Sequence, residues 1–249
     1  MLQSKGPTAK RLVRYERAAV LFDIDGTLIT THGAGRRAFV VCLKEVFGIE
    51  DDLSDLEFAG GTDRALLARI LERHGRRPTP ADERRFFQCL PRALNDLLCR
   101  RPAEPLPGVR RLLSRLAEDR RFVIGLLTGN IPRCAQLKLE SADLEGYFDF
   151  GGFGGEHAHR ADVARAAIRE MMIRCGGTVP PVIWVVGDTI FDVEAAKAIS
   201  AFALGVAGGR YCVRDLLEAG AAAAVETLEY IGPDFFLSGG DPQVGGREE

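Results

Sequence analysis

Residues 20–28 read Val-Leu-Phe-Asp-Ile-Asp-Gly-Thr-Leu, and this stretch decides the fold of the chain. Three apolar residues run directly into Asp23 and Asp25 and then into a glycine, which predicts a buried strand that ends in two carboxylates. Side chains two positions apart on a strand share a face, so both acids point the same way if the strand geometry continues through Asp25. Such a pair is electrostatically costly unless a cation lies between the carboxylates or one of them holds a proton. A divalent cation would relieve the repulsion, and Mg2+ typically takes one or two protein carboxylates together with water and substrate phosphate.

The composition of the chain limits the class of protein. Its 249 residues suit one large domain or one domain with a smaller insert, and 46% of them are hydrophobic, which is enough for a sizeable core. The formal net charge is −2, so no overall basic field predicts a nucleic-acid partner. No apolar run approaches the roughly 20 residues of a membrane helix, so no membrane partner is expected.

Both ends of the chain are predicted to be flexible. The basic residues within 1–17 are not followed at once by an apolar stretch, which favours a flexible leader over a secretory signal. Residues 238–249 are rich in Gly, Asp and Glu and are predicted to form a frayed tail.

Cysteine usage indicates the redox compartment. The six cysteines form no C-x-x-C pair and their spacings are irregular, which argues against a zinc site or a disulfide framework. Free thiols in a reducing cytosol fit this pattern better, so we expect a cytoplasmic protein. The cysteines stand at positions 42, 89, 99, 134, 175 and 212.

Beyond residue 108, strand-like and helix-like segments alternate, which predicts an α/β fold with a Rossmann-like, doubly wound parallel sheet. The strands are nearly continuous apolar runs, as expected of strands that are buried on both faces. Ligands of such sheets lie beyond the carboxyl ends of the strands, where Asp23, Thr128 and Asp188 all fall. The principal predicted strands after the first are Phe122–Leu127, Phe148–Phe153, Val182–Val186 and Phe202–Val206, with a small edge strand at Ala222–Val225.

About 80 residues separate the first strand from the rest of the sheet, and they carry helical patterns rather than strands. Apolar residues recur at mixed spacings of three and four in Gly33–Phe47, Thr62–His74 and Pro80–Arg101. We therefore predict an α-helical cap at 32–105, inserted into a catalytic core formed by 18–31 and 106–237. The proline-rich stretch 100–108 is the predicted return linker.

Three motifs in this order resemble those of the haloacid dehalogenase superfamily of phosphohydrolases. Asp23-Ile24-Asp25-Gly26-Thr27-Leu28 resembles its first motif, Thr128 at a strand end its second, and Gly187-Asp188-Thr189-Ile190-Phe191-Asp192 its fourth. The resemblance covers nearly the whole chain, because many members place a helical lid after the first motif. It is closest in kind to the phosphoglycolate phosphatase-like members that carry a helical cap.

The resemblance implies a role for each motif residue. Asp23 would be the nucleophile that forms an aspartyl-phosphate, and Asp25 the general acid and then the base. Mg2+ would be held by Asp23, Asp188 and the backbone carbonyl of Asp25, with Asp192 supporting the metal site. Asp192 is equally well interpreted as a helix cap, and it can serve both purposes.

The resemblance also implies residues for phosphate binding and for the cation of the third motif. Thr128 would bond the phosphoryl oxygens with help from the backbone N–H groups of Gly129 and Asn130. The family's usual Lys-Pro is absent, which leaves Lys138 and Arg160 as candidates. We favour Lys138, a compact point charge flanked by leucines; the alternative for either residue is a solvated surface cation.

Two further features of the sequence have competing interpretations. Arg64, in the cap segment Ala59–Arg64, could contact a substrate carboxylate or phosphate, although capping by Thr62 or Asp63 with a solvent-facing Arg64 explains the segment slightly better. His157 and His159 invite a metal interpretation but are also ordinary loop residues.

The sequence as a whole favours a cytoplasmic, Mg2+-dependent phosphatase of a small phosphorylated metabolite, phosphoglycolate-like or a sugar phosphate, acting as a monomer or small homo-oligomer. One alternative is a phosphosugar mutase of the same superfamily, which needs lid residues that exclude water. The other is a non-catalytic phosphate-binding protein, which would not need Asp25.

Overall fold

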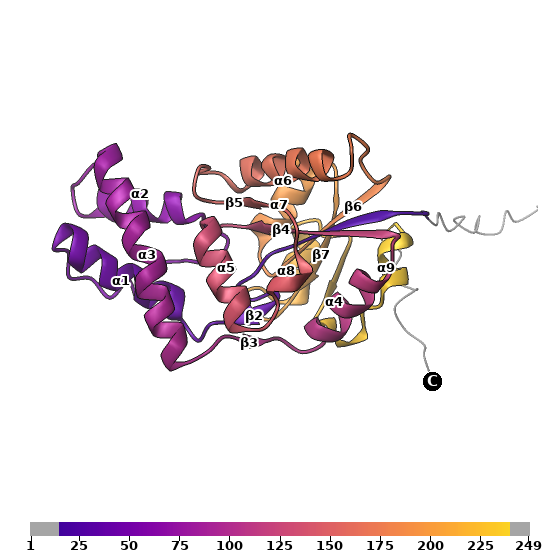
Figure 1. The fold of residues 1–249 in the computed structure, drawn as a ribbon, viewed down its shortest axis with the longest axis horizontal. Helices are drawn as coiled ribbons and strands as arrows, with labels where there is room; N and C mark the ends of the chain where they lie inside the picture. The colour runs from indigo at the N-terminus through magenta and orange to yellow at the C-terminus, as the bar shows by residue number, and fades with distance from the viewer. Residues whose placement is uncertain (1–14, 240–249) are drawn as a thin grey trace, which may run out of the picture.

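The computed structural model describes residues 15–239 (Figure 1). Apart from residues 15–17 and 238–239, the predicted leader and tail lie outside these residues. The centre of the molecule is a sheet of six parallel strands in the order β5-β4-β1-β6-β7-β8. The strands are β1 Ala18–Phe22, β4 Phe122–Thr128, β5 Gly151–Phe153, β6 Val182–Gly187, β7 Phe202–Val206 and β8 Ala223–Val225.

The strand order places β1 at the topological switch point of the sheet. From β1 the chain passes to β4 and outward to β5, then returns to the other side of β1 as β6 and continues outward to β7 and β8. Phe22 of β1 pairs with Leu126 of β4 and with Val186 of β6, so the three central strands end at the same edge. The crevice at such an edge is where doubly wound sheets bind ligands.

Helices cover both faces of the sheet, so the predicted doubly wound α/β fold is confirmed. Alternate residues of β1 point to opposite faces: Val20 and Phe22 belong to one core and Leu21 to the other. On the Leu21 face lie α6 Arg160–Arg174, α7 Ile190–Ala198 and α8 Val213–Glu218. On the opposite face lie α4 Val109–Glu118, α5 Pro132–Ser141 and α9 Pro233–Leu237.

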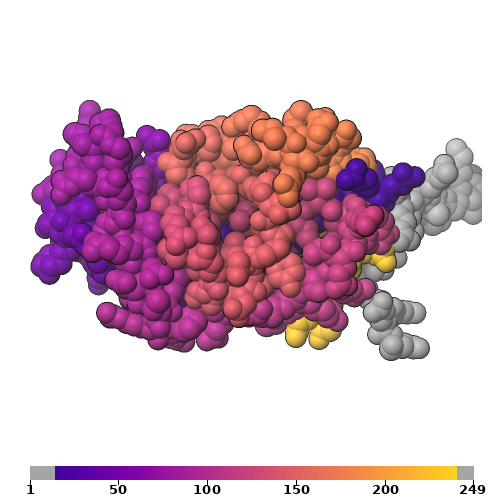
Figure 2. Space-filling view, in the orientation of Figure 1, coloured from indigo at the N-terminus to yellow at the C-terminus, as the bar shows by residue number. Residues whose placement is uncertain are grey.

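A separate group of helices forms one end of the molecule (Figures 1 and 2). It consists of α1 Ala34–Phe47, α2 Asp63–Arg73 and α3 Pro80–Arg100, and we call residues 31–103 the cap. Phe39 of α1 packs edge-on against Phe86 of α3, with ring centroids 5.1 Å apart. The cap lies between two short strands, β2 Ile29–Thr30 and β3 Glu104–Pro105, which pair antiparallel.

The cap also contains a disulfide, which corrects the expectation of free thiols. Cys42 of α1 is bonded to Cys89 of α3, and their Cα atoms lie 5.8 Å apart. The pairing follows from the packing of two helices whose cysteines are 47 positions apart, a separation that carries no signal in the sequence. Among the described cysteines, Cys99, Cys134, Cys175 and Cys212 are free.

Several short elements differ from the sequence prediction. The predicted strand Phe148–Phe153 is shorter, because a 3-10 turn at Glu145–Tyr147 delays contact with the sheet until Phe150, whose carbonyl accepts a bond of 3.0 Å from Leu126 N. The pair β2–β3 was missed because two-residue strands carry no periodic pattern, and α4 and α9 were also missed. A second 3-10 turn spans Leu228–Tyr230. None of the helices within residues 15–239 is both long and apolar enough to span a membrane.

Candidate active site

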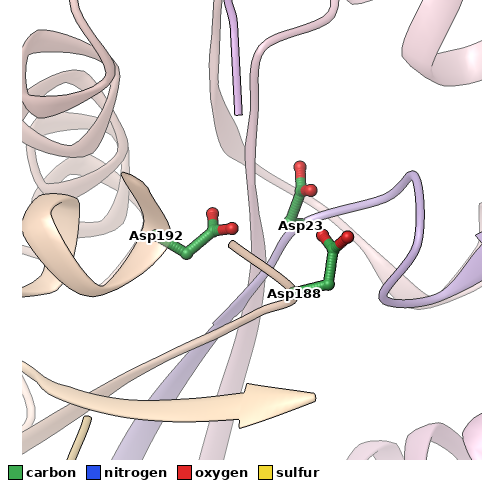
Figure 3. Close-up of side chains that lie close together, drawn as sticks. All are labelled: Asp23, Asp188 and Asp192. Atoms are coloured by element: carbon green, nitrogen blue, oxygen red, sulfur yellow. The ribbon is translucent and has the colours of Figure 1, made fainter. Parts of the chain in front are cut away.

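Three carboxylates meet at the edge where the central strands end (Figure 3). Asp23 directly follows β1, Asp188 directly follows β6, and Asp192 reaches in from the first turn of α7. One carboxylate oxygen of each residue lies within 4.8 Å of those of the other two, and all three residues are buried. Among the described residues, this is the one group of three or more side chains with a metal-ligating arrangement.

Local backbone geometry holds Asp188 against the loop that follows β1. Gly26 has a φ of 81°, and the Asp188 carboxylate occupies the space that a Cβ at this position would need. The Thr27 hydroxyl donates to Asp188 Oδ1 at 3.3 Å. The glycine of the first motif is therefore required both by its left-handed backbone and by the acid packed on it.

Asp192 serves the structure of α7 as well as the acidic cluster. Its Oδ2 accepts bonds from the Thr189 backbone N–H at 3.1 Å and from the Thr189 hydroxyl at 2.7 Å, and Thr189 accepts from Asp192 N in return. This is a capping box. The other carboxylate oxygen, Oδ1, faces the cluster, so the two interpretations of Asp192 are compatible.

Arg160 lies at the start of α6 and joins two of the acids. Its Nη2 lies 2.7 Å from Asp23 Oδ1 and 2.6 Å from Asp192 Oδ1, and it donates to the carbonyl of Leu127 at 3.3 Å. Burial opposes the charge of this guanidinium, but the carboxylates of Asp192 and Asp23 more than compensate and raise the pKa of Arg160 above its usual value. Arg160 is therefore a fixed cation beneath Asp23.

One guanidinium does not neutralise three buried carboxylates. Burial, and then repulsion from the neighbouring acids, raises the pKa of Asp188 above its usual range. Burial also raises the pKa of Asp23, against the opposing charge of Arg160. A divalent cation would remove this penalty, and oxygen donors suit hard cations, of which Mg2+ is one. The residues present therefore fit a Mg2+ ion.

Asp25 has a different cationic partner from Asp23. Its Oδ2 lies 2.5 Å from Lys138 Nζ and accepts a bond of 2.9 Å from the Asn130 side chain, whose own oxygen accepts from Lys138 at 2.6 Å. Burial alone would raise the pKa of Asp25, but the Lys138 charge and the Asn130 amide lower it below its usual value. The two acids of the first motif thus do not share one cation; each is paired with its own.

The loop after β4 completes the polar end of the site. Thr128 is fully buried, and its hydroxyl accepts from the Asn130 side chain at 2.8 Å and from the Asn130 backbone at 3.3 Å. Gly129 follows at a point where a Cβ would collide with the carbonyl oxygen of Gly61 in the cap. The predicted phosphate-binding residues therefore lie on the loop where core and cap touch.

Asp63, at the start of α2, is an acid for which the sequence indicates only a helix cap. Its Oδ2 accepts a bond of 2.7 Å from the Ile131 backbone N–H, and its own N–H donates to the Gly129 carbonyl at 2.8 Å. Thr62 is the residue that caps α2, through a bond of 3.1 Å from Ala65 N. Burial, against the charge of Lys138, raises the pKa of Asp63 to about 6. Nothing in the local sequence indicates that a carboxylate at the start of one helix will accept a hydrogen bond from the start of another.

Arg64 is not brought into the site. Its guanidinium pairs with Glu83 of α3 at 3.1 Å and donates to the Glu156 carbonyl at 3.4 Å, at the outer edge of the contact between cap and core. His157 and His159 do not belong to the acidic cluster. Apart from Asp192, the other predicted site residues line a common cavity.

This cavity has a volume of about 300 Å3 and lies between the sheet edge and the cap. Its two ends differ in character. The core end, which we call the floor, is lined by charged and polar residues: Asp23, Asp25, Thr128, Gly129, Asn130, Lys138, Arg160 and Asp188. The cap end, which we call the roof, contributes the apolar side chains of Ala38, Phe39, Phe58, Leu66, Leu90 and Leu94, together with Thr31, Arg36, Ala59, Asp63 and four glycines.

Comparison with known proteins matches both the sequence and the fold. A family model described as haloacid dehalogenase-like hydrolase matches residues 18–200. The chain is 29% identical over 196 residues to a phosphoglycolate phosphatase of Synechococcus elongatus, an alignment that covers 77% of this chain and 84% of that protein.

Solved structures share the fold over most of the chain. A variant of CbbY from Rhodobacter sphaeroides in complex with xylulose-(1,5)bisphosphate superposes with a TM-score of 0.69 at 20% identity, covering 89% of this chain and 99% of that one. A candidate beta-phosphoglucomutase from Thermotoga maritima superposes with a TM-score of 0.55 at 27% identity, covering 89% and 96% of the two chains.

Proposed function

Because this chain belongs to the haloacid dehalogenase-like hydrolases, we propose that it is a Mg2+-dependent phosphatase that releases phosphate from a small phosphorylated metabolite. The observation that carries the proposal is the convergence of Asp23, Asp188 and Thr128 at the carboxyl ends of β1, β6 and β4. A protein that only binds phosphate would need neither a buried acid aimed into the cavity nor a second acid beside it.

The metal-binding residues in this proposal are Asp23, Asp188 and the backbone carbonyl of Asp25. Asp192 supports them by holding Arg160 in place, at 2.6 Å. When bound, Mg2+ supplies positive charge that shields Asp23 from the anionic substrate and offsets the charge that develops during phosphoryl transfer.

Asp23 acts as the nucleophile. Its Oδ1 is held by Arg160, so the orientation of the carboxylate is fixed before substrate arrives. The P–O bond to the leaving alcohol breaks as the Asp23 oxygen bonds to phosphorus, and water then hydrolyses the aspartyl-phosphate. The Thr128 hydroxyl and the loop backbone at Gly129 and Asn130 bind the phosphoryl oxygens.

Asp25 handles the proton in both steps. Pairing with Lys138 favours the ionised form of Asp25, which is the form needed to accept a proton from the attacking water. Donation to the leaving alcohol needs the protonated form, and the negative charge of a bound phosphate raises the pKa of a nearby acid in that direction. The two cations therefore have different roles. Arg160 positions the nucleophile, and Lys138 favours the ionised form of the acid–base residue.

A phosphosugar mutase is the second candidate function, and the likeness to the candidate beta-phosphoglucomutase favours it. A mutase returns the phosphoryl group to the sugar instead of to water. Incubation with a hexose 1-phosphate distinguishes the two, because a mutase yields the 6-phosphate and a phosphatase yields inorganic phosphate.

The decisive experiment measures phosphate release from a panel of phosphomonoesters with Mg2+ and with chelator. We expect turnover that is lost on chelation and restored by Mg2+. Asp23→Asn should reduce kcat by at least about 10^4-fold, whereas Asp149→Asn, an exposed acid paired with Arg174, should leave it unchanged. Turnover by a correctly folded Asp23→Asn variant, or turnover that survives full chelation, would overturn the mechanism.

A further inference from the structure

The residues that line the roof of the cavity indicate the chemical character of the leaving group better than the sequence motifs do. Apolar residues of three cap helices line the cavity: Phe39 from α1, Leu66 from α2, and Leu90 and Leu94 from α3. Phe58 closes the same wall and packs edge-on against Phe39, with ring centroids 5.3 Å apart. The group attached to the phosphate oxygen must lie against this surface, because the floor holds the phosphate.

The charged side chains that line the cap end already have partners in the protein. Arg36 donates to the carbonyls of Ser54 and Leu56 at 3.2 and 3.1 Å, and its guanidinium lies 5.2 Å from the centroid of the Phe58 ring. Asp63 accepts from Ile131 N. A leaving group rich in hydroxyls would exchange much of its hydrogen bonding to water for contacts with hydrocarbon, which is costly.

The size of the cavity limits the leaving group as well. A volume of about 300 Å3 is at the lower end for small-molecule sites, and the phosphate occupies part of it. The remaining space suits a short alkyl chain or a single ring.

From these observations, and on the basis of the proposed function, we propose that the preferred substrates are phosphate monoesters of small apolar alcohols, aliphatic or aromatic. The hydrocarbon body packs under α1 and α3 while Asp23 attacks the phosphorus. The roof thus selects by burying apolar surface rather than by hydrogen bonding.

A matched series of esters tests the proposal with the wild-type enzyme and Mg2+. The apolar arm consists of ethyl, propyl, butyl and hexyl phosphate, with benzyl phosphate for a ring, and the polar arm of phosphoglycolate, glycerol 3-phosphate and glucose 6-phosphate. Each buried methylene should raise kcat/KM by up to about four-fold until the cavity is full. Propyl phosphate should exceed glycerol 3-phosphate, which has the same carbon chain, by about ten-fold or more.

The possible outcomes separate this inference from the proposed function. If glycerol 3-phosphate or phosphoglycolate matches or exceeds the alkyl ester of equal length, the apolar preference is wrong although phosphatase activity stands. If no ester in either arm releases phosphate with Mg2+, the proposed function itself fails.

A substitution in the roof tests whether the hydrocarbon part of the ester binds there. Leu94→Phe narrows the cavity, so it should lower the ratio of kcat/KM for hexyl phosphate to that for ethyl phosphate by about ten-fold or more. Leu71→Phe places the same enlargement in α2 at a buried position that does not line the cavity, and should leave the ratio unchanged. If Leu94→Phe does not fold, Ala38→Val narrows the same wall by less. An unchanged ratio in a folded roof variant would overturn the proposal.

Discussion

The floor and the roof of the cavity are built on opposite principles. The floor consists of buried charged residues at the ends of strands that are far apart in the chain. Their burial raises the pKa values of Asp23 and Asp188. The roof is made of helix faces whose apolar side chains would be ordinary core residues in any helical protein. Floor residues can be exchanged for few others without losing the chemistry, whereas roof residues can vary as long as they remain apolar and fill a similar volume.

Within this comparison, the largest expected effect on stability comes from removing Arg160, the cation that is paired with Asp23. Arg160→Met leaves Asp23 and Asp192 buried without their shared partner, so we expect a loss of about 3–5 kcal/mol in the free energy of unfolding. The activity should fall by about 10^2- to 10^3-fold, because the nucleophile is no longer held in position. Chemical denaturation and steady-state kinetics measure the two effects.

Lys138→Met is the matched substitution for Asp25, the other acid of the first motif. Removing the Lys138 charge takes away the main effect that opposes burial, so the pKa of Asp25 should rise and the acidic limb of the pH–activity profile should move to higher pH. The nucleophile keeps its partner, so kcat at the optimum should fall less than in Arg160→Met. Equal and small losses in both variants would contradict both assignments.

The disulfide in the cap should contribute more to the stability of the roof than any single contact. Closing a loop of 47 residues corresponds to about 4 kcal/mol in the chain-entropy model. We expect the reductant dithiothreitol, or Cys42→Ser, to lower the free energy of unfolding by a large part of this value. Cys99→Ser, at an exposed free thiol, is the control and should change little. An oxidised wild type that unfolds like Cys42→Ser would show that the bond adds nothing.

Asp63 is a carboxylate at the seam between roof and floor, and it predicts a pH dependence. Its pKa is raised to about 6 in the folded protein from 3.8 in the unfolded chain, so the folded state binds a proton more tightly. The contribution of Asp63 to stability should therefore fall as the pH rises from about 4 through 6, with a full penalty of about 3 kcal/mol above that range.

Asp63→Asn should remove this penalty, because Asn retains an oxygen that can accept from Ile131 N. The variant should be more stable than the wild type at pH 8, and the difference should vanish near pH 4. Thermal melting at several pH values measures the difference. A variant that is less stable than the wild type at pH 8 would show that Lys138 and the start of α5 favour the charged form more than burial opposes it.

The smallest effect is expected at Arg64, on the rim outside the cavity. Its pair with Glu83 is partly exposed, so Arg64→Ala should change the free energy of unfolding by about 1 kcal/mol or less. KM should change little, since the guanidinium does not line the cavity. A large rise in KM for every ester would place Arg64 on the substrate and would show that the cap moves during turnover.

The sequence predicted the family, the fold and the kind of enzyme, and these predictions are confirmed by the family model and by the parallel sheet. The reason is physical: acids such as Asp23 and Asp188 directly after apolar runs are hard to explain except at strand ends that share a ligand. The pattern also selected Lys138 and Arg160, but it did not show which acid each would face, because that depends on how α5 and α6 pack on the sheet.

Apart from the short elements, the features that the sequence missed arise from contacts between distant helices. Cys42 and Cys89 meet only because α1 packs on α3. Leu90 and Leu94 follow the normal helical spacing of core residues, so nothing local distinguishes a side chain that fills a core from one that lines a cavity. Asp63 resembled a helix cap, and its bond to Ile131 depends on the docking of α2 against α5.

The antiparallel pairing of Ile29–Thr30 with Glu104–Pro105 has a consequence for how new specificities could arise. The chain leaves the core through β2 and returns to it through β3, the paired strand, so the length of residues 31–103 has little effect on the strands that carry the catalytic residues. The entropy of closing a loop grows only with the logarithm of its length, by about 0.6 kcal/mol per doubling. Residues 31–103 therefore behave as an exchangeable unit. Grafting the corresponding segment of a relative onto β2 and β3 should change which alcohol is released while leaving the phosphoryl chemistry intact.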